Sequence, residues 1–206
     1  MGSNLAPHLR LVLVTDDRLL AGRDVVEVAR RAVAGGVTLV QLRLKRAGAR
    51  ELVDLARRLR EALPVPVLVN DRPDVARVSG TGVHLGPDDL PLDAARRLLP
   101  PGAIVGISAG TAEEAASGRG ADYWGVGPWR ATATKSDAGV ALGAEGFGRI
   151  VRLAEGIPCV AIGGILPDDV PAVLKAGGVG VAVVSGILGV EDVEGAARAY
   201  ARALTR

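Results

Sequence analysis

Short apolar segments alternate along the chain with longer stretches in which apolar residues recur every three or four positions. The short segments are rich in Val, Ile and Leu, which is typical of strands buried on both faces of a parallel sheet. The longer stretches have the spacing of helices that cover such a sheet. We expect strands at 9–15, 39–43, 67–70, 82–85, 104–108, 123–126, 159–162 and 181–184. We expect helices at 24–34, 49–63, 92–99, 146–154, 168–176 and 191–204.

Repeats of a strand followed by a helix predict a single (β/α)8 TIM barrel in the α/β class. An open doubly wound sheet is the alternative that the same units allow. It is disfavoured because Asp16-Asp17-Arg18 follows the first strand, where a dinucleotide-binding sheet carries a Gly-x-Gly-x-x-Gly turn. At 206 residues the chain has the size of one small barrel. We therefore expect one TIM-barrel domain over 1–206, with 1–8 as a loosely ordered terminus.

Composition narrows the classes of partner. The chain is 49% hydrophobic but has one Phe, two Tyr and two Trp, so Val, Leu, Ile and Ala must fill the core. A net charge of +2 is too balanced for a general nucleic-acid surface, and no apolar run approaches a membrane span. The single cysteine, Cys159, lies in an apolar run and is expected to be a buried, inert thiol of a cytoplasmic protein. Small-molecule substrates are the expected partners, with a homodimer left open and neither nucleic acid nor membrane.

Candidate chemistry gathers where the predicted strands end. Because the carboxyl ends of parallel barrel strands form one rim, residues remote in sequence become neighbours there. Amides, cations and carboxylates follow the second, third and fourth strands, and hydroxyls and a lysine follow the fifth and sixth. These residues are Gln41, Arg43, Lys45, Asn70, Asp71, His84, Asp88, Asp89, Ser108, Thr132, Thr134 and Lys135.

Two cations stand close together at the end of the second strand. Gln41, Arg43 and Lys45 alternate along this strand, so their side chains are predicted to project to one side. The intervening Leu42 and Leu44 face the other side. Paired cations in a partly buried place need a counter-charge, which a bound anion would supply. The alternative is a network of ion pairs with the carboxylates of the rim.

Two further features indicate phosphorylated ligands. Asp71 with Asp88 or Asp89 offers the carboxylate oxygens that Mg²⁺ takes alongside substrate phosphates, although Asp88 also suits a capped turn. Gly163-Gly164 and Ser185-Gly186 follow the seventh and eighth strands, where barrels commonly bind phosphate through backbone N–H groups. The sequence therefore predicts two anion sites on one rim.

Motifs spread over nearly the whole chain resemble those of the thiamine-phosphate synthase family, also called thiamine-phosphate pyrophosphorylase. They are VTD (14–16), GVTLVQLR (36–43), NDR (70–72), GVHLG (82–86), GADY (120–123), TATK (132–135), AIGGI (161–165) and VVS (183–185). The resemblance implies a TIM-barrel enzyme that joins 4-amino-5-hydroxymethyl-2-methylpyrimidine diphosphate to a thiazole phosphate, giving thiamine phosphate and pyrophosphate.

The resemblance also implies roles for individual residues. The pyrimidine diphosphate is held by Gln41, Arg43, Lys45, Asn70, Ser108 and Lys135. The thiazole phosphate is received by Thr132, Thr134, Gly164, Val184 and Ser185, and the remaining substrate-binding positions are Leu42, Leu44 and Ala133. Mg²⁺ is held by Asp71 and Asp89, and the catalytic residues are Arg43, Lys45, Ser108 and Lys135. Metal and cations would stabilise the departing pyrophosphate, so no protein nucleophile is required.

The chain departs from the family pattern at Leu44, Pro87, Gly110, Trp129 and Arg130. Two alternatives to the synthase follow. One is a thiazole tautomerase-like isomerase of the same fold, which is disfavoured because such proteins lack the Asn-Asp and Thr-x-Thr-Lys elements. The other is a weakened barrel that binds or senses a phosphorylated ligand.

Hydrolase and zinc chemistry have little support in the sequence. No nucleophile elbow, His-Glu-x-x-His helix or Cys-x-x-Cys pair occurs in it. His84 has no second histidine near it in sequence, so we expect it to be a packing residue rather than a metal ligand.

Overall fold

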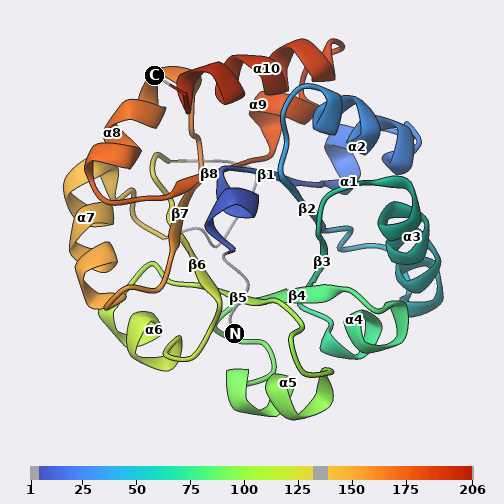
Figure 1. Ribbon diagram of the computed structural model, residues 1–206, viewed down its shortest axis with the longest axis horizontal. Coiled ribbons are helices and arrows are strands. Elements are labelled where there is room, and N and C mark those ends of the chain that lie inside the picture. Colours follow the sequence, from blue (N-terminus) through green and yellow to red (C-terminus); the bar gives the residue numbers. More distant parts are fainter. Residues whose placement is uncertain (1–4, 132–138, 206) are drawn as a thin grey trace.

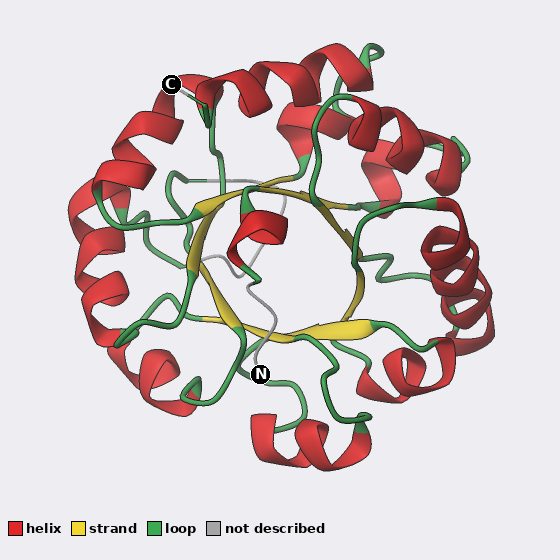
Figure 2. Cartoon of the chain, in the orientation of Figure 1, coloured by secondary structure: helices red, strands yellow, loops and turns green. Residues whose placement is uncertain are grey.

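Eight parallel strands of four residues each close into a barrel in sequence order (Figures 1 and 2). The computed structural model describes residues 5–131 and 139–205. The strands are β1 (Leu11–Val14), β2 (Leu39–Leu42), β3 (Val67–Asn70), β4 (Gly82–Leu85), β5 (Val105–Ser108), β6 (Tyr123–Val126), β7 (Cys159–Ile162) and β8 (Gly180–Val183). Pairing of β1 with both β2 and β8 closes the barrel, which confirms the predicted TIM-barrel fold.

A ring of helices surrounds the barrel (Figure 2). The main ones are α2 (Val25–Ala34), α3 (Ala49–Ala62), α4 (Pro73–Ser79), α5 (Leu92–Leu98), α6 (Ala112–Ser117), α7 (Gly143–Leu153), α8 (Val170–Lys175) and α10 (Val193–Ala203). Shorter elements are η1 (Ala6–Leu9), α1 (Asp17–Leu20), η2 (Pro167–Asp169) and α9 (Ser185–Leu188). The helices α4 and α6 were not predicted, although α5 and α8 are equally short and were.

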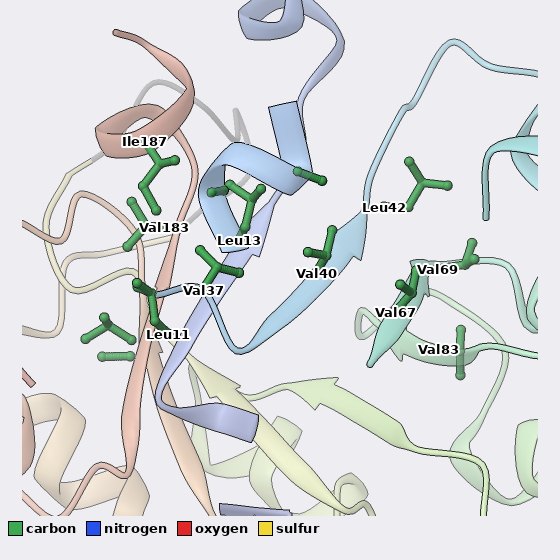
Figure 3. Packing of buried hydrophobic residues seen from close by; sticks show 14 of the residues in the cluster. Leu11, Leu13, Val37, Val40, Leu42, Val67, Val69, Val83, Val183 and Ile187 are labelled. Atoms are coloured by element: carbon green, nitrogen blue, oxygen red, sulfur yellow. The ribbon is translucent and has the colours of Figure 1, made fainter. Parts of the chain in front are cut away.

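Strand side chains alternate between two apolar layers. Leu11 and Leu13 of β1 belong to the layer between barrel and helices, together with Val40 and Leu42 of β2 (Figure 3). The intervening positions face the barrel interior, where a smaller cluster consists of Leu9, Val12, Val14, Leu39, Leu68, Tyr123, Val160 and Ala182. The predicted core of small aliphatic residues is confirmed by both layers.

The short helix η1 lies at the N-terminal end of the barrel and is seen over its centre in Figure 1. Its last residue, Leu9, is fully buried and joins the interior cluster. Part of the segment expected to be a loosely ordered terminus, Ala6 to His8, is therefore helical. Because η1 covers this end, the rim formed by the carboxyl ends of the strands is the face on which a ligand can enter.

Candidate active site

Four consecutive strands contribute polar side chains to the barrel interior near the C-terminal rim. Leu39 and Leu68 face inward, so the period of two turns Gln41 and Asn70 inward as well. Gln41 is 4% exposed, and its Nε2 donates to Asn70 Oδ1 at 2.8 Å. This bond ties β2 to β3 across the floor of the rim and leaves both amides with defined orientations.

His84 of β4 continues this polar floor toward β5 and β6. Its Nδ1 lies 2.8 Å from Tyr123 Oη and its Nε2 lies 3.2 Å from Ser108 Oγ. The two rings are 5.5 Å apart between centroids, and His84 is almost fully buried. The expectation of a packing histidine is thus refined, since its ring also holds the hydroxyl of a candidate substrate-binding residue.

The two candidate cations lie beyond the end of β2, which stops at Leu42. Arg43 Nη1 pairs with Asp16 Oδ2 at 3.2 Å, and both side chains are largely buried. Lys45 lies in a turn, where its Nζ pairs with Asp71 Oδ2 at 2.5 Å. The ion-pair alternative is therefore confirmed for Lys45, whereas the partner of Arg43 is a residue that the sequence analysis had given no role.

Asp71 and Asp89 interact with each other beside Lys45. Burial alone would raise the pKa of Asp71, but hydrogen bonds with Asp89 and Lys45 outweigh it and hold this pKa below its ordinary value. Burial, then the hydrogen bond with Asp71, raises the pKa of Asp89 to about 6, although Asp89 also accepts from Gly86 N at 2.6 Å. The two carboxylates crowd one another, which is the arrangement that a bound cation relieves.

The backbone at Asp71 has a left-handed conformation, with a φ of 63°. Asp and Asn tolerate this region better than most residues with a side chain, but it remains uncommon. The chain leaves β3 through this turn, and Asp71 N donates to His84 O at 2.8 Å. The turn directs the Asp71 carboxylate back over the rim toward Lys45.

A cavity of about 460 Å³ occupies the mouth of the barrel. Arg43, Ser108, Gly164, Val184 and Ser185 are among the residues that line it. A neighbouring groove of about 730 Å³ shares Ser108 and Pro87 with this cavity and is also lined by Asp89. Side chains from the second strand and loops after the seventh and eighth strands thus face a common space.

The loops after β7 and β8 offer backbone groups, rather than charged side chains, to a ligand. Gly163 and Gly164 have φ values of 96° and 67°, a conformation that favours glycine. The segment that leaves β6 runs beside them, with Trp129 N donating to Ile162 O at 2.8 Å and Arg130 N to Gly163 O at 2.9 Å. After β8 the chain enters α9 at Ser185, where the first N–H groups of a helix have no partner within it.

The structure brings most of the predicted site together. Gln41, Asn70 and Ser108 lie on the interior floor, and the two cations and two carboxylates stand around its edge. Leu42 does not reach the cavity, because it is fully buried in the layer between barrel and helices, and Leu44 packs against that same layer. The remaining predicted residues, Thr132, Ala133, Thr134 and Lys135, lie outside the described residues.

Three positions that depart from the family pattern have a local explanation. A Cβ at Gly110 would come within 2.7 Å of Gly127 O, so a side chain has no room there. Trp129 is 6% exposed and packs edge-on against Phe147 with ring centroids 5.7 Å apart. Arg130 pairs with Asp169 through both Nε and Nη2. These changes anchor the backbone around the cavity.

Within 5–131 and 139–205, no cluster of three or more His, Cys, Asp or Glu side chains could by itself hold a metal. Two carboxylates do suit Mg²⁺, which usually binds proteins through one or two carboxylates and completes its shell with water and substrate phosphates. In the same described part of the chain, no helix is long and apolar enough to cross a membrane.

Comparisons with known proteins identify the kind of enzyme. The sequence profile of the family described as "Thiamine monophosphate synthase" matches residues 11–187, from β1 into α9. Thiamine-phosphate synthase of Moorella thermoacetica is 46% identical over 206 residues, covering 97% of this chain and 98% of that protein. Thiamine-phosphate synthase of Azorhizobium caulinodans is 50% identical over 201 residues, covering 93% and 94%.

A solved structure agrees in both fold and sequence. Thiamine phosphate pyrophosphorylase from Pyrococcus furiosus superposes with a TM-score of 0.88 at 38% identity, covering 98% of each chain. The protein is thus a transferase built on a TIM barrel. The chain belongs to the thiamine-phosphate synthase family and acts in thiamine biosynthesis. The predicted family and enzyme class are confirmed, in preference to the isomerase and to the non-catalytic barrel.

Proposed function

We propose that this rim joins a pyrimidine diphosphate to a thiazole phosphate, with the diphosphate on the β2–β5 side and the single phosphate beside β7 and β8. The observation that carries the proposal is the cluster of Lys45, Asp71 and Asp89, of which Asp89 lines the groove that adjoins the cavity lined by Arg43. Cations beside crowded carboxylates suit a diphosphate with its bound metal better than a free diphosphate or a free metal ion. The cations balance the charge of the phosphates, and the carboxylates balance the charge of the metal.

The diphosphate binds to the charged side of the rim in this proposal. Arg43 and Lys45 neutralise its oxygens, and the resemblance assigns Lys135, which follows β6 in the sequence, to the same diphosphate. Gln41 and Asn70 present oriented amides to the pyrimidine from the floor, and Ser108, held by His84, offers a hydroxyl. The amide bond between Gln41 and Asn70 fixes which atoms face the ring and so favours one orientation of the substrate.

Mg²⁺ is the metal that suits this site. Asp71 and Asp89 would hold it, and it would supply Lewis-acid stabilisation of the pyrophosphate leaving group. Burial first, and then the neighbouring Asp71 carboxylate, raise the pKa of Asp89, and this supports the assignment, because a bound cation would favour the charged form of both carboxylates. Lys45, already bonded to Asp71, stands where it can contact the same phosphate oxygens.

The thiazole phosphate binds to the backbone side of the rim. Gly164, Val184 and Ser185 line the cavity there, and barrels commonly bind phosphate at the loops after strands seven and eight beside a short extra helix such as α9. The resemblance assigns Thr132 and Thr134, which follow β6 in the sequence, to the same phosphate. Val184 and Ala182 add an apolar wall against which a thiazole ring can pack.

The chemistry requires positioning rather than a protein nucleophile. The bond between the pyrimidine methylene and the diphosphate oxygen breaks, and its electron pair leaves with pyrophosphate. The lone pair of the thiazole nitrogen then forms the new bond to that methylene carbon. Arg43, Lys45 and Lys135 stabilise charge on the departing oxygens, and Ser108 orients the pyrimidine.

A pyrophosphate-release assay tests the proposal, with both substrates present and Mg²⁺ added or chelated. We expect release only when both substrates and the metal are present. Binding of the thiazole phosphate by calorimetry, without binding of the pyrimidine diphosphate and without pyrophosphate release, would overturn it. We further propose a cytoplasmic enzyme, since its one cysteine is a free thiol, and leave the homodimer as a question for sedimentation analysis.

A further inference from the structure

Three consecutive residues after β1 hold the segment that carries both rim cations. Thr15, Asp16 and Asp17 follow the end of β1, and β1 pairs with β2 in parallel (Figure 1). Each of the three side chains binds a different group of the segment 43–46. We propose that these residues, here termed the 15–17 clamp, are the positioning element for Arg43 and Lys45, an inference that rests on the diphosphate site proposed above.

Thr15 fixes the backbone of Arg43. Its Oγ1 accepts from Arg43 N at 2.8 Å and donates to Arg43 O at 3.2 Å. Thr15 is fully buried, and its own N donates to Gln41 O at 3.0 Å. One hydroxyl therefore takes the place of the backbone hydrogen bonds between β1 and β2 at the point where β2 ends. It sets the direction in which the Arg43 side chain leaves the barrel.

Asp16 fixes the guanidinium of Arg43 and a helix at the same time. Its Oδ1 accepts from Arg18 N at 3.0 Å and Leu19 N at 3.2 Å, which caps α1. Its Oδ2 accepts from Arg43 Nη1 at 3.2 Å. The helix cap holds the carboxylate still, so the ion pair has a rigid anchor. A guanidinium carries five N–H groups, and Arg43 also lines the cavity, so the anchor leaves donors directed at a ligand.

Asp17 fixes the turn that carries Lys45. Its Oδ2 accepts from Lys45 N at 2.8 Å and its Oδ1 accepts from Arg46 N at 3.4 Å. The ammonium of Lys45 reaches Asp71 on the other side. The backbone of this lysine is thus held from β1 while its charge is directed toward β3. Since diphosphate binding depends on donors placed before the ligand arrives, the clamp contributes to affinity without touching the substrate.

The test is Asp16→Asn, since Asn caps a helix as well as Asp does but carries no charge for Arg43. Calorimetry with inorganic pyrophosphate and Mg²⁺ should show a dissociation constant raised on the order of tenfold. The KM of the thiazole phosphate should stay within about twofold, because its site lies across the cavity. The double variant with Arg43→Ala should bind no worse than Arg43→Ala alone, since Asp16 acts through that side chain.

Asp24→Asn is the matched control. Asp24 caps α2 through Oδ1, accepting from Val26 N and Glu27 N, and its Oδ2 pairs with Arg58 at 3.0 Å. This is the same double role on the outer surface, with both side chains about half exposed. Pyrophosphate binding should be unchanged in Asp24→Asn, which separates the loss of a charged cap from the loss of a clamp.

The outcomes separate the clamp from the site that it serves. Normal or tighter pyrophosphate binding in Asp16→Asn, while Arg43→Ala binds weakly, overturns the clamp and leaves the diphosphate site intact. Additive losses in the double variant also overturn it. Normal binding in Arg43→Ala overturns both proposals. Should Asp16→Asn fail to fold, Asp17→Ala tests the clamp at its more exposed position through the backbone of Lys45, with several-fold weaker pyrophosphate binding expected and unchanged binding overturning the clamp.

Discussion

The two halves of the rim are built from different chemical groups. From β2 to β5 the inward positions near the rim are Gln41, Asn70, His84 and Ser108, and charged side chains stand above them. From β6 round to β1 the corresponding surface is small or apolar, with Gly125, Ile162, Ala182 and Val14 lining the cavity. One half therefore relies on side-chain charge held by ion pairs, and the other on backbone conformation. The first should be sensitive to loss of charge and the second to added bulk.

The largest effect is expected from Asp71→Asn on the charged half. Asn tolerates the left-handed backbone at this position, so the turn should persist while the charge is lost. We expect pyrophosphate release to fall about 100-fold and to require more Mg²⁺. A magnesium titration of the release rate measures both. Asp74→Asn is the control, because Asp74 is an exposed carboxylate paired with Arg72, and an equal loss in that variant would contradict a specific role for Asp71.

A smaller effect, of a different kind, is expected from Gly163→Ala on the backbone half. The added Cβ would lie 2.7 Å from Pro128 Cβ at a φ of 96°. We expect the KM of the thiazole phosphate to rise about tenfold, with little change in pyrophosphate binding. The control is Gly156→Ala, whose φ is 98° with nothing within 4 Å of the new Cβ.

Stability separates the two glycine variants. Strain alone should lower the free energy of unfolding by about 1–2 kcal/mol in Gly156→Ala, and overlap should lower it by roughly a further 1–3 kcal/mol in Gly163→Ala. Urea unfolding measures the difference. If the two variants matched in both stability and KM, the backbone at Gly163 would have no special part in the phosphate site.

Tyr123→Phe tests whether the polar floor matters beyond stability. The variant removes the hydrogen bond to His84 Nδ1 and should lower the free energy of unfolding by about 1–2 kcal/mol. Because His84 also contacts Ser108, we expect the KM of the pyrimidine diphosphate to rise a few-fold. Tyr200→Phe loses one buried bond, to Ile165 O at 2.9 Å, and should lose similar stability with unchanged kinetics. Equal kinetics in the two variants would restrict His84 to packing.

The smallest effect is expected at Cys159, on the apolar half of the barrel. Burial raises the pKa of its thiol to about 12, so at pH 8 roughly one molecule in 10,000 carries the reactive thiolate. Iodoacetamide should therefore leave the folded enzyme unmodified and fully active, while the urea-unfolded chain is alkylated. Mass spectrometry measures the modification. Rapid alkylation of the folded chain, with loss of activity, would contradict the prediction that Cys159 is an unreactive packing residue.

Much of the fold followed from local pattern. The apolar segments predicted all eight strands to within a few residues, because buried parallel strands have an apolar signature that does not depend on their partners. The helices α4 and α6 were missed, although α5 and α8 have the same lengths and were predicted. The helix expected from Gly146 begins at Gly143, because glycines conceal its first turn.

The sequence predicted which types of residue form the candidate site, and the structure added which of their side chains are in contact. Gln41, Asn70, Asp71, Asp89 and Ser108 were expected at strand ends and lie there. Asp16 was missed because a carboxylate after the first strand also reads as an ordinary helix cap, and only the parallel pairing of β1 with β2 shows that its second oxygen meets Arg43. Leu42 was expected near the substrate from the family resemblance, whereas the alternation of β2 buries it against the helices.

The sequence by itself determined the barrel, the family and the types of side chain on its rim, since strand periodicity and short motifs depend only on neighbours along the chain. The tertiary structure decided which charges meet. Arg43 pairs with Asp16, Lys45 pairs with Asp71, and burial together with the neighbouring Asp71 raises the pKa of Asp89. These partners are 18 to 27 residues apart, and electrostatic interactions depend on distance and burial. Only closure of the barrel sets both.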